Sequence, residues 1–439
     1  MTPLRSLAYS AARKLLSGLP LPIATPVELV RAADGTTSRP LAFKRIALAG
    51  KGAADADLLV RHLEEAGARV EGPGDSPADV VIGFLPERAG AEDLAGLYAM
   101  LHGRVDTLHD RGRVLLMVRS GAPIVTGGVN AFVRSLAREL GGRGTTVNAV
   151  VSQELELASP IVAFLASERA SYVSGQTWTL HAGAIPVQVP SPGPRLAVVT
   201  GAAQGIGESI VRVLAANGYR IALLDLESQT SAGRSLCDAI GGEPAGMAFH
   251  ACDVRDTEQV ARVLETARAA SPMGMIDLLV NNAGITRDRT FRKMTPQEWA
   301  EVHAVDLAAV VGVTRSAQPL LAPSARVVNV ASVSGLAGNF GQTNYACAKG
   351  AVVGYTAQVA RELEPRGIAV TAVAPGLIET AMTHAIPALQ REVAAQMTSL
   401  AQIGLPQDVA MVVELLGRRE AWPLRGQAVR VDGGMFFGS

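Results

Sequence analysis

A hydroxyl, a phenol and an ammonium group lie within one short stretch of the chain, at spacings that would let them act on one molecule. Tyr345 and Lys349 are four residues apart, so on a helix they lie on the same face. Ser332 precedes Tyr345 by thirteen residues and directly follows an apolar run that predicts a buried strand. These side chains could hold a carbonyl oxygen and deliver a proton to it. Because Tyr and Lys at this spacing also occur on solvated helix faces, the surrounding elements must decide.

The sequence after residue 194 alternates short apolar runs with stretches of helical period, among them 207–216 and 348–363. Alternation of this kind predicts a doubly wound parallel sheet, which binds ligands beyond the carboxyl ends of its strands. Ser332 and Tyr345 fall at such a place. The strands are expected at 196–199, 221–224, 278–280, 327–331, 370–373 and 429–431.

The first half of the chain shows the same alternation, with strand-like runs at 46–50, 80–84, 114–118 and 146–151 and a helical stretch at 56–66. The fold class is therefore α/β, with two Rossmann-like doubly wound parallel-sheet domains, the N-terminal one shorter.

The expected divisions of the chain are a leader, two domains and a linker. Four prolines in the nine residues 186–194 predict a semi-rigid extended linker between domains at 41–185 and 195–439. Residues 1–40 form the leader, which we interpret as a short docking helix with a Pro-rich lead-in. It lacks the apolar core of a signal peptide.

The two halves resemble each other, which indicates an internal duplication. The segment K-G-A-V-V-G-Y-T-A-Q-V-A-R-E-L (349–363) aligns with T-G-G-V-N-A-F-V-R-S-L-A-R-E-L (126–140), and further matches follow in the same order. In this alignment Ala122 replaces the tyrosine and Thr126 replaces the lysine. The N-terminal copy is therefore predicted to be a degenerate, non-catalytic scaffold.

A glycine-rich turn, T-G-A-A-Q-G-I-G (200–207), follows the first strand of the second domain and opens a helix. Glycines allow the backbone to turn tightly and approach a pyrophosphate, and the helix N-terminus offers free N–H groups. Asp225 ends the next strand, eighteen residues after Gly207, where a carboxylate can accept hydrogen bonds from ribose hydroxyls and repel a 2′-phosphate. The pattern predicts a dinucleotide site that favours NADH, with NADPH possible.

The composition argues against several other classes of protein. The forty basic and forty acidic residues cancel, which argues against a nucleic-acid partner. The three cysteines have no metal-type spacing and are too few for a disulfide framework. No apolar run is long enough to span a bilayer. We expect a cytoplasmic protein that uses no metal.

These motifs together resemble the short-chain dehydrogenase/reductase family: T-G-x-x-x-G-x-G, N-N-A-G, S-x12-Y-x-x-x-K and P-G occur in that family's order over 195–439. The segments at 281–288, 338–345 and 374–383 are similar to 3-oxoacyl-ACP reductases of fatty-acid synthesis. The degenerate first copy is similar to the high-molecular-weight branch of those reductases. The resemblance implies an NADH-preferring homodimer that reduces 3-oxoacyl thioesters, carried by acyl carrier protein or coenzyme A, to 3-hydroxyacyl thioesters.

The resemblance also implies roles for individual residues. Ser332 would orient the substrate carbonyl, Tyr345 would deliver the proton, and Lys349 would lower the pKa of the phenol and hold the nicotinamide ribose. The residues expected at the cofactor are Gly201, Gln204, Gly205, Ile206, Gly207, Asp225, Asp253, Val254, Asn281, Ala283, Gly284, Tyr345, Lys349, Pro375, Ile378 and Thr380.

Two positions need separate treatment. Asp306 stands where the family has an asparagine that helps hold a water beside the lysine, so we expect a working but altered proton relay. Arg366 matches a basic residue that docks the acyl carrier protein in the family. A cation at a helix C-terminus would explain Arg366 equally well.

Two other functions stay open. A short-chain reductase of another ketone or alcohol would share every motif above. A nucleotide-binding pseudo-enzyme would fit Asp306 and the degenerate first copy, although it would not explain the intact Ser332, Tyr345 and Lys349.

Overall fold

The computed structural model describes residues 26–35, 38–50, 56–72, 77–119, 121–183, 193–269, 271–384 and 386–435. Most of the expected leader and of the Pro-rich linker lies outside these ranges, so the docking helix and the domain boundaries stay predictions. Among the described residues no helix is long and apolar enough to cross a membrane.

The N-terminal half contains a six-stranded parallel sheet in the order β2-β1-β3-β4-β5-β6. Its strands are β1 (Arg45–Ala49), β2 (Arg69–Glu71), β3 (Ala78–Phe84), β4 (Leu108–Val118), β5 (Thr146–Val151) and β6 (Gln176–Thr179). Its helices are α2 (Asp57–Glu65), α3 (Ala91–Leu94), α4 (Gly96–Thr107), α5 (Pro123–Leu140) and α6 (Leu155–Ala166).

The C-terminal half contains a seven-stranded parallel sheet in the order β13-β12-β11-β10-β7-β8-β9. Its strands are β7 (Leu196–Thr200), β8 (Arg220–Asp225), β9 (Met247–Ala251), β10 (Ile276–Asn281), β11 (Leu321–Val330), β12 (Ala369–Pro375) and β13 (Ala428–Val431). The helices are α7 (Gly205–Ala216), α8 (Thr230–Ala239), α9 (Thr257–Ala269), α10 (Pro296–His303), α11 (Ala309–Ala317), α12 (Val333–Ala337), α13 (Thr343–Leu363), α14 (Ala381–His384), α15 (Ala388–Gln396) and α16 (Pro406–Leu416).

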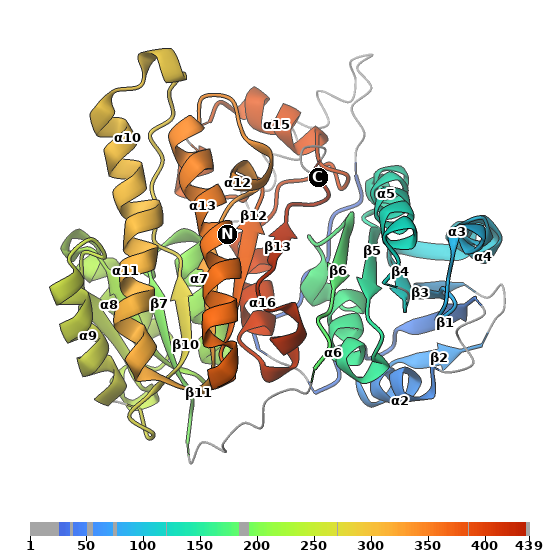
Figure 1. Cartoon of the computed structure of the whole chain (residues 1–439), viewed down its shortest axis with the longest axis horizontal. Coiled ribbons are helices and arrows are strands. Elements are labelled where there is room, and N and C mark those ends of the chain that lie inside the picture. Colours follow the sequence, from blue (N-terminus) through green and yellow to red (C-terminus); the bar gives the residue numbers. More distant parts are fainter. Residues whose placement is uncertain are drawn as a thin grey trace.

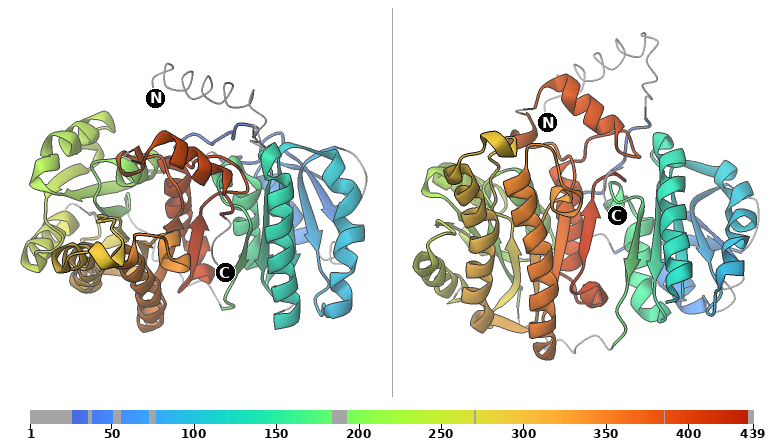
Figure 2. Two further views of the ribbon diagram at one scale, coloured as in Figure 1. Left: turned by 90° about the horizontal axis from the view of Figure 1, so that it is seen from above. Right: turned by 45° about the horizontal axis from the view of Figure 1, so that its top comes forward.

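The two sheets have the same strand order, apart from β9 at the outer edge of the second. Helices cover both faces of each sheet (Figures 1 and 2), and the strands are buried Val, Ile, Leu and Ala runs of the kind that doubly covered parallel sheets require. The α/β fold class with two Rossmann-like parallel sheets is therefore confirmed. Helix α5 corresponds to α13, as the sequence repeat predicts. Helix α6 corresponds to α16 by its place before the last strand of its sheet.

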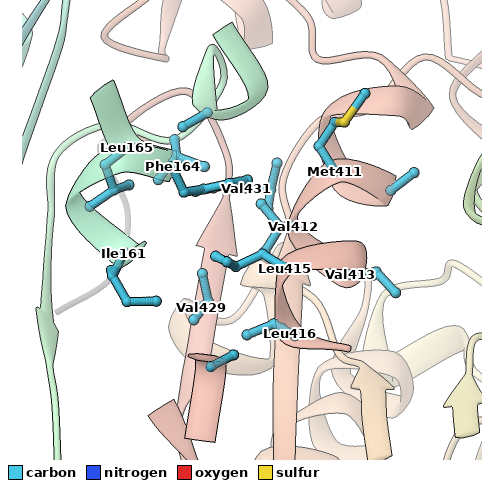
Figure 3. Close-up of a cluster of buried hydrophobic side chains, with 14 of the residues drawn as sticks. Ile161, Phe164, Leu165, Met411, Val412, Val413, Leu415, Leu416, Val429 and Val431 are labelled. Atoms are coloured by element: carbon cyan, nitrogen blue, oxygen red, sulfur yellow. The ribbon is translucent and has the colours of Figure 1, made fainter. Parts of the chain in front are cut away.

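A continuous apolar core joins the two halves. Side chains of α6 pack against α16 and β13, with Ile161, Phe164 and Leu165 on one side and Val412, Leu415 and Val431 among those on the other (Figure 3). Each of these side chains is buried. The two copies thus fold around a shared hydrophobic cluster, and a pair of equivalent helices, α6 and α16, supplies much of it.

The facing edge strands β6 and β13 are bridged by one side chain. The Gln176 amide nitrogen donates to the Arg430 carbonyl at 2.8 Å, and the Gln176 amide oxygen accepts from the Arg430 N–H at 3.1 Å. This side chain therefore makes the two bonds that a neighbouring strand would make. The edges of both sheets are covered where the halves meet (Figure 1).

Candidate active site

A cavity of about 500 Å³ opens at the carboxyl ends of the strands in the C-terminal sheet. Its position is the one expected for ligands of a doubly wound sheet. The residues of the predicted site that line it are Gly201, Gln204, Gly205, Ile206, Gly207, Asp225, Asp253, Val254, Ala283, Gly284, Ser332, Tyr345, Lys349, Pro375, Ile378 and Thr380.

The glycine turn between β7 and α7 has a backbone that only glycine accepts easily. Gly201 and Gly205 have φ values of +62° and +60°. A Cβ added at Gly207 would lie 1.9 Å from the Gly201 carbonyl oxygen, so the helix start and the turn are in direct contact. The Asn282 amide holds the turn by donating to the carbonyls of Thr200 and Gly201 at 3.0 and 2.9 Å. This cradle at the N-terminus of α7 suits the pyrophosphate of a dinucleotide.

The Asp225 carboxylate lies at the end of β8, beside this turn. One oxygen accepts the Ala203 N–H at 2.9 Å and the other accepts the Leu226 N–H at 2.8 Å. The side chain is thereby fixed and lines the cavity. Arg255 lines the same cavity, but its guanidinium is paired with the Asp253 carboxylate at 2.5 Å. A carboxylate held in this way can accept hydrogen bonds from ribose hydroxyls.

Ser332, Tyr345 and Lys349 are brought together beneath the cavity. Ser332 is the N-cap of α12, and its oxygen accepts the Ser334 N–H at 3.1 Å, which leaves its own proton free to be donated. The Lys349 ammonium lies 5.7 Å from the centre of the Tyr345 ring, one helical turn along α13. It also donates to the Val330 carbonyl at 2.9 Å. The close spacing expected from the sequence is present.

Asp306 is buried against the lysine. A π-helical turn, η7 (Ala304–Ala308), interrupts the run from α10 to α11 and carries Asp306 inward, where it has no exposed surface. One carboxylate oxygen lies 3.1 Å from the Lys349 ammonium, and the other accepts the Ile285 N–H at 3.0 Å. A Cβ added at Gly284 would lie 2.6 Å from Asp306, so this glycine makes room for the ion pair.

The electrostatics of the pair act on the phenol. Burial disfavours the charged form of Lys349, but Asp306 and Tyr345 outweigh burial and hold the lysine pKa above its ordinary value. Burial raises the pKa of Tyr345, Lys349 lowers it and Asp306 raises it, and the net direction is upward. Lys349 lowers the Tyr345 pKa, which is the direction expected from the sequence. Burial outweighs the lysine, so the net pKa of Tyr345 is raised.

Besides Asp306, two predicted site residues lie away from the cavity lining. Asn281 is buried behind it, where its amide nitrogen donates to Thr314 and Asn329 at 2.9 and 2.8 Å. Arg366 lies at the C-terminal end of α13 and donates to the carbonyls of Gln318 and Leu321 at 2.8 and 3.1 Å. These contacts give both side chains structural partners.

Several lining residues were not predicted from the sequence: Leu226, Gln229, Arg255, Asn282 and Arg287. Asn282 could have been found, because it stands inside the N-N-A-G motif beside Asn281. The other four lie in loops whose approach to the cavity depends on the packing of β8, β9 and β10. Among the described residues no group of three His, Cys, Asp or Glu side chains is placed to hold a metal ion.

Comparison with known proteins agrees with this geometry. The family described as short chain dehydrogenase matches residues 195–391. The 3-oxoacyl-[acyl-carrier-protein] reductase of Thermotoga maritima is 38% identical over 243 residues, which are 55% of this chain and 97% of that protein. The chain belongs to the short-chain dehydrogenase/reductase family. It is an oxidoreductase of that family.

Other relatives of the short-chain dehydrogenase/reductase family give the same picture. The reductase of the same name from Escherichia coli is 35% identical over 244 residues, again 55% of this chain and 97% of that protein. A crystal structure of a short-chain dehydrogenase/reductase from Brucella melitensis matches with a TM-score of 0.53 and 28% identity, over 57% of this chain and 100% of that one. Each of these proteins is about the size of the C-terminal half alone.

Proposed function

We propose that this protein reduces 3-oxoacyl thioesters to 3-hydroxyacyl thioesters, with NADH as the favoured cofactor. The observation that carries the proposal is the convergence of Ser332, Tyr345 and Lys349 beside a glycine turn and Asp225 in one cavity. The relatives at 34–38% identity are named for this reduction of acyl-carrier-protein substrates, which selects it among the reactions of the family. As in those reductases, the reaction would belong to fatty-acid biosynthesis.

In the proposed mechanism, a bound nicotinamide supplies the hydride that reduces the 3-keto carbon. The Ser332 hydroxyl donates to the carbonyl oxygen and fixes its direction. The Tyr345 phenol then gives its proton to that oxygen, so that the product is the neutral 3-hydroxyacyl thioester. Tyr345 is left as a phenolate and must recover a proton before the next turnover.

Lys349 and Asp306 set how Tyr345 behaves in this cycle. The ammonium stabilises the phenolate formed when Tyr345 gives up its proton. The Asp306 carboxylate holds Lys349 as an ammonium and opposes its effect on the phenol. We therefore propose that Tyr345 recovers its proton without Lys349 losing one, which is the altered relay that the aspartate predicts.

The proposal also covers the choice between NADH and NADPH and the choice between acyl carrier protein and coenzyme A substrates. The fixed Asp225 carboxylate supports NADH over NADPH. Arg366 does not support carrier-protein docking strongly, because its guanidinium is bound to two backbone carbonyls. Acyl-CoA and acyl carrier protein are both proposed as substrates. A cytoplasmic homodimer is proposed from the resemblance of the chain to its relatives.

The decisive experiment measures oxidation of NADH and of NADPH by the full chain with acetoacetyl-CoA and with acetoacetyl-acyl carrier protein. We expect turnover with both carriers and a higher kcat/KM with NADH. Turnover with simple ketones but neither thioester would favour a different reductase of the same family. Tight NADH binding with no turnover of any ketone would favour a pseudo-enzyme.

A further inference from the structure

A buried tyrosine of the N-terminal half, Tyr172, packs against a loop that lies behind one wall of the cavity. Tyr172 follows the short turn η3 (Glu168–Ala170) and precedes β6, and it has no exposed surface. The Tyr172 side chain extends from the N-terminal half into the C-terminal half. The Tyr172 hydroxyl donates to the Gln402 carbonyl at 2.8 Å, and the Tyr172 carbonyl accepts the Gly433 N–H at 3.0 Å.

The ring of Tyr172 fits between two glycines of the C-terminal half. A Cβ at Gly404 would lie 2.4 Å from the ring, and a Cβ at Gly433 would lie 2.6 Å from its other edge. Neither position could carry a larger residue without displacing the tyrosine. The two copies therefore pack so closely here that the tyrosine and both glycines depend on one another.

The loop that Tyr172 contacts, residues 398–404, is joined directly to one wall of the cavity. The Gly404 N–H donates to the Leu377 carbonyl at 3.0 Å, and the Glu379 N–H donates to the Gly404 carbonyl at 2.8 Å. A Cβ at Gly404 would also lie 2.6 Å from the Ile378 side chain. Gly404 is thus held between Tyr172 and Ile378, and Ile378 lines the cavity. The resemblance to the family implies that Ile378 would meet the nicotinamide carboxamide.

Other contacts from the N-terminal half hold the same 398–404 loop. The Gln402 amide nitrogen donates to the Val27 carbonyl at 2.8 Å, and its amide oxygen accepts the Leu29 N–H at 3.4 Å. A Cβ at Gly141 would lie 1.8 Å from the Ser399 carbonyl oxygen, so that turn of the N-terminal half lies directly on the loop. The loop is fixed from the N-terminal side over most of its length.

We propose that Tyr172 is a positioning residue for the nicotinamide end of the cofactor, acting from the N-terminal half through Gly404 and Ile378. Tyr172 does not line the cavity, so it would touch neither cofactor nor substrate. The degenerate copy would then have lost its own chemistry and kept a part in the chemistry of the other copy. This inference rests on the proposed use of a nicotinamide cofactor.

The test compares two ligands that differ at the nicotinamide. NADH binding is followed by nicotinamide fluorescence, and ADP-ribose binding by titration calorimetry, because ADP-ribose lacks the nicotinamide ring. In full-length Tyr172→Phe we expect NADH to bind more weakly, by at most the about fivefold that the free energy of one buried hydrogen bond corresponds to, while the ADP-ribose Kd stays unchanged. Tyr172→Leu, which also removes the ring, should enlarge the NADH effect and keep the selectivity.

Tyr219→Phe is the matched control. Tyr219 is another buried tyrosine whose hydroxyl donates to a backbone carbonyl, that of Gly417 at 3.2 Å, and it does not line the cavity. This variant should bind both ligands like the wild type. Equal weakening of NADH and ADP-ribose in both Tyr172 variants, or no change in either ligand, would overturn the inference. Failure of the cofactor proposal would show in the wild-type protein, which would then bind neither NADH nor NADPH.

Discussion

The Asp306 carboxylate lies 3.1 Å from the Lys349 ammonium, at a depth where neither side chain has appreciable exposure. The aspartate places one buried negative charge in the site and pairs it directly with the lysine. Because both charges lie near the Tyr345 phenol, the ion pair acts on the pKa of Tyr345.

The first prediction concerns the pH profile of Asp306→Asn. The charged or polar groups that act on Tyr345 are Lys349, Asp306, Ser332 and Asp288. Asp306 raises the Tyr345 pKa, so removing its charge should lower that pKa. Reduction needs the protonated phenol, and its loss at high pH should therefore begin at a lower pH than in the wild type. The measurement is kcat/KM for reduction against pH, together with ultraviolet titration of the phenolate in the free protein.

Asp288→Asn is the control for that experiment. Asp288 also raises the Tyr345 pKa, but its effect is smaller than those of burial, Lys349, Asp306 and Ser332. Its carboxylate lies at the surface, where it accepts a hydrogen bond from the Gln342 amide. Its removal should shift the profile less. Identical profiles for wild type and Asp306→Asn would show that the buried carboxylate has no part in the proton relay.

The second prediction concerns the proton donor. Tyr345→Phe removes the phenolic hydroxyl and keeps the ring, so the fold and the cavity walls should be preserved. We expect reduction to fall by at least about 10²-fold, since general-acid catalysis contributes on that order. NADH should bind with a Kd close to that of the wild type. Wild-type turnover in this variant would mean that another group donates the proton and that Tyr345 is not the general acid.

The third prediction concerns cofactor choice. Asp225→Asn keeps the size of the side chain and removes the charge. Its single amide oxygen can accept only one of the two N–H groups, of Ala203 and Leu226, that the carboxylate accepts. The ratio of kcat/KM for NADPH to that for NADH should rise by about tenfold, which corresponds to about 1.4 kcal/mol. An unchanged ratio would mean that the loop after β8, and not the carboxylate, selects the cofactor.

The fourth prediction separates the two explanations of Arg366. Its guanidinium joins the end of α13 to the start of β11 through Gln318 and Leu321. Arg366→Ala should therefore lower the free energy of unfolding by about 1 kcal/mol. The ratio of activities with acyl carrier protein and coenzyme A substrates should stay unchanged. A selective loss with the carrier protein would show that this arginine docks it.

Much of the fold follows from patterns that are local in the sequence. Buried parallel strands are continuous apolar runs, and the repeat between 349–363 and 126–140 predicts equivalent helices. Strand β2 was missed because it has only three residues, too few for a pattern to stand out, and lies at the edge of its sheet. Helix α13 begins at Thr343, before its apolar period becomes regular, so Tyr345 lies in its first turn.

The site divides in the same way. Ser332, Tyr345 and Lys349 are found by spacing, because a strand, a cap and a helix fix their geometry. The spacing does not give the net pKa of Tyr345, because that pKa depends mainly on how deeply the folded chain buries the phenol. The Tyr172 contact was not predicted either, because it joins residues more than two hundred positions apart and depends on how the two copies pack.

The contact between the edge strands β6 and β13 has a consequence for how the enzyme responds to dilution. In an assembly of separate chains, such an interface dissociates as the protein concentration falls. Here the two surfaces belong to one polypeptide, so their encounter is intramolecular and its effective concentration does not depend on how much protein is present. The contacts made by Gln176 and Tyr172 should therefore persist in a single molecule at any dilution.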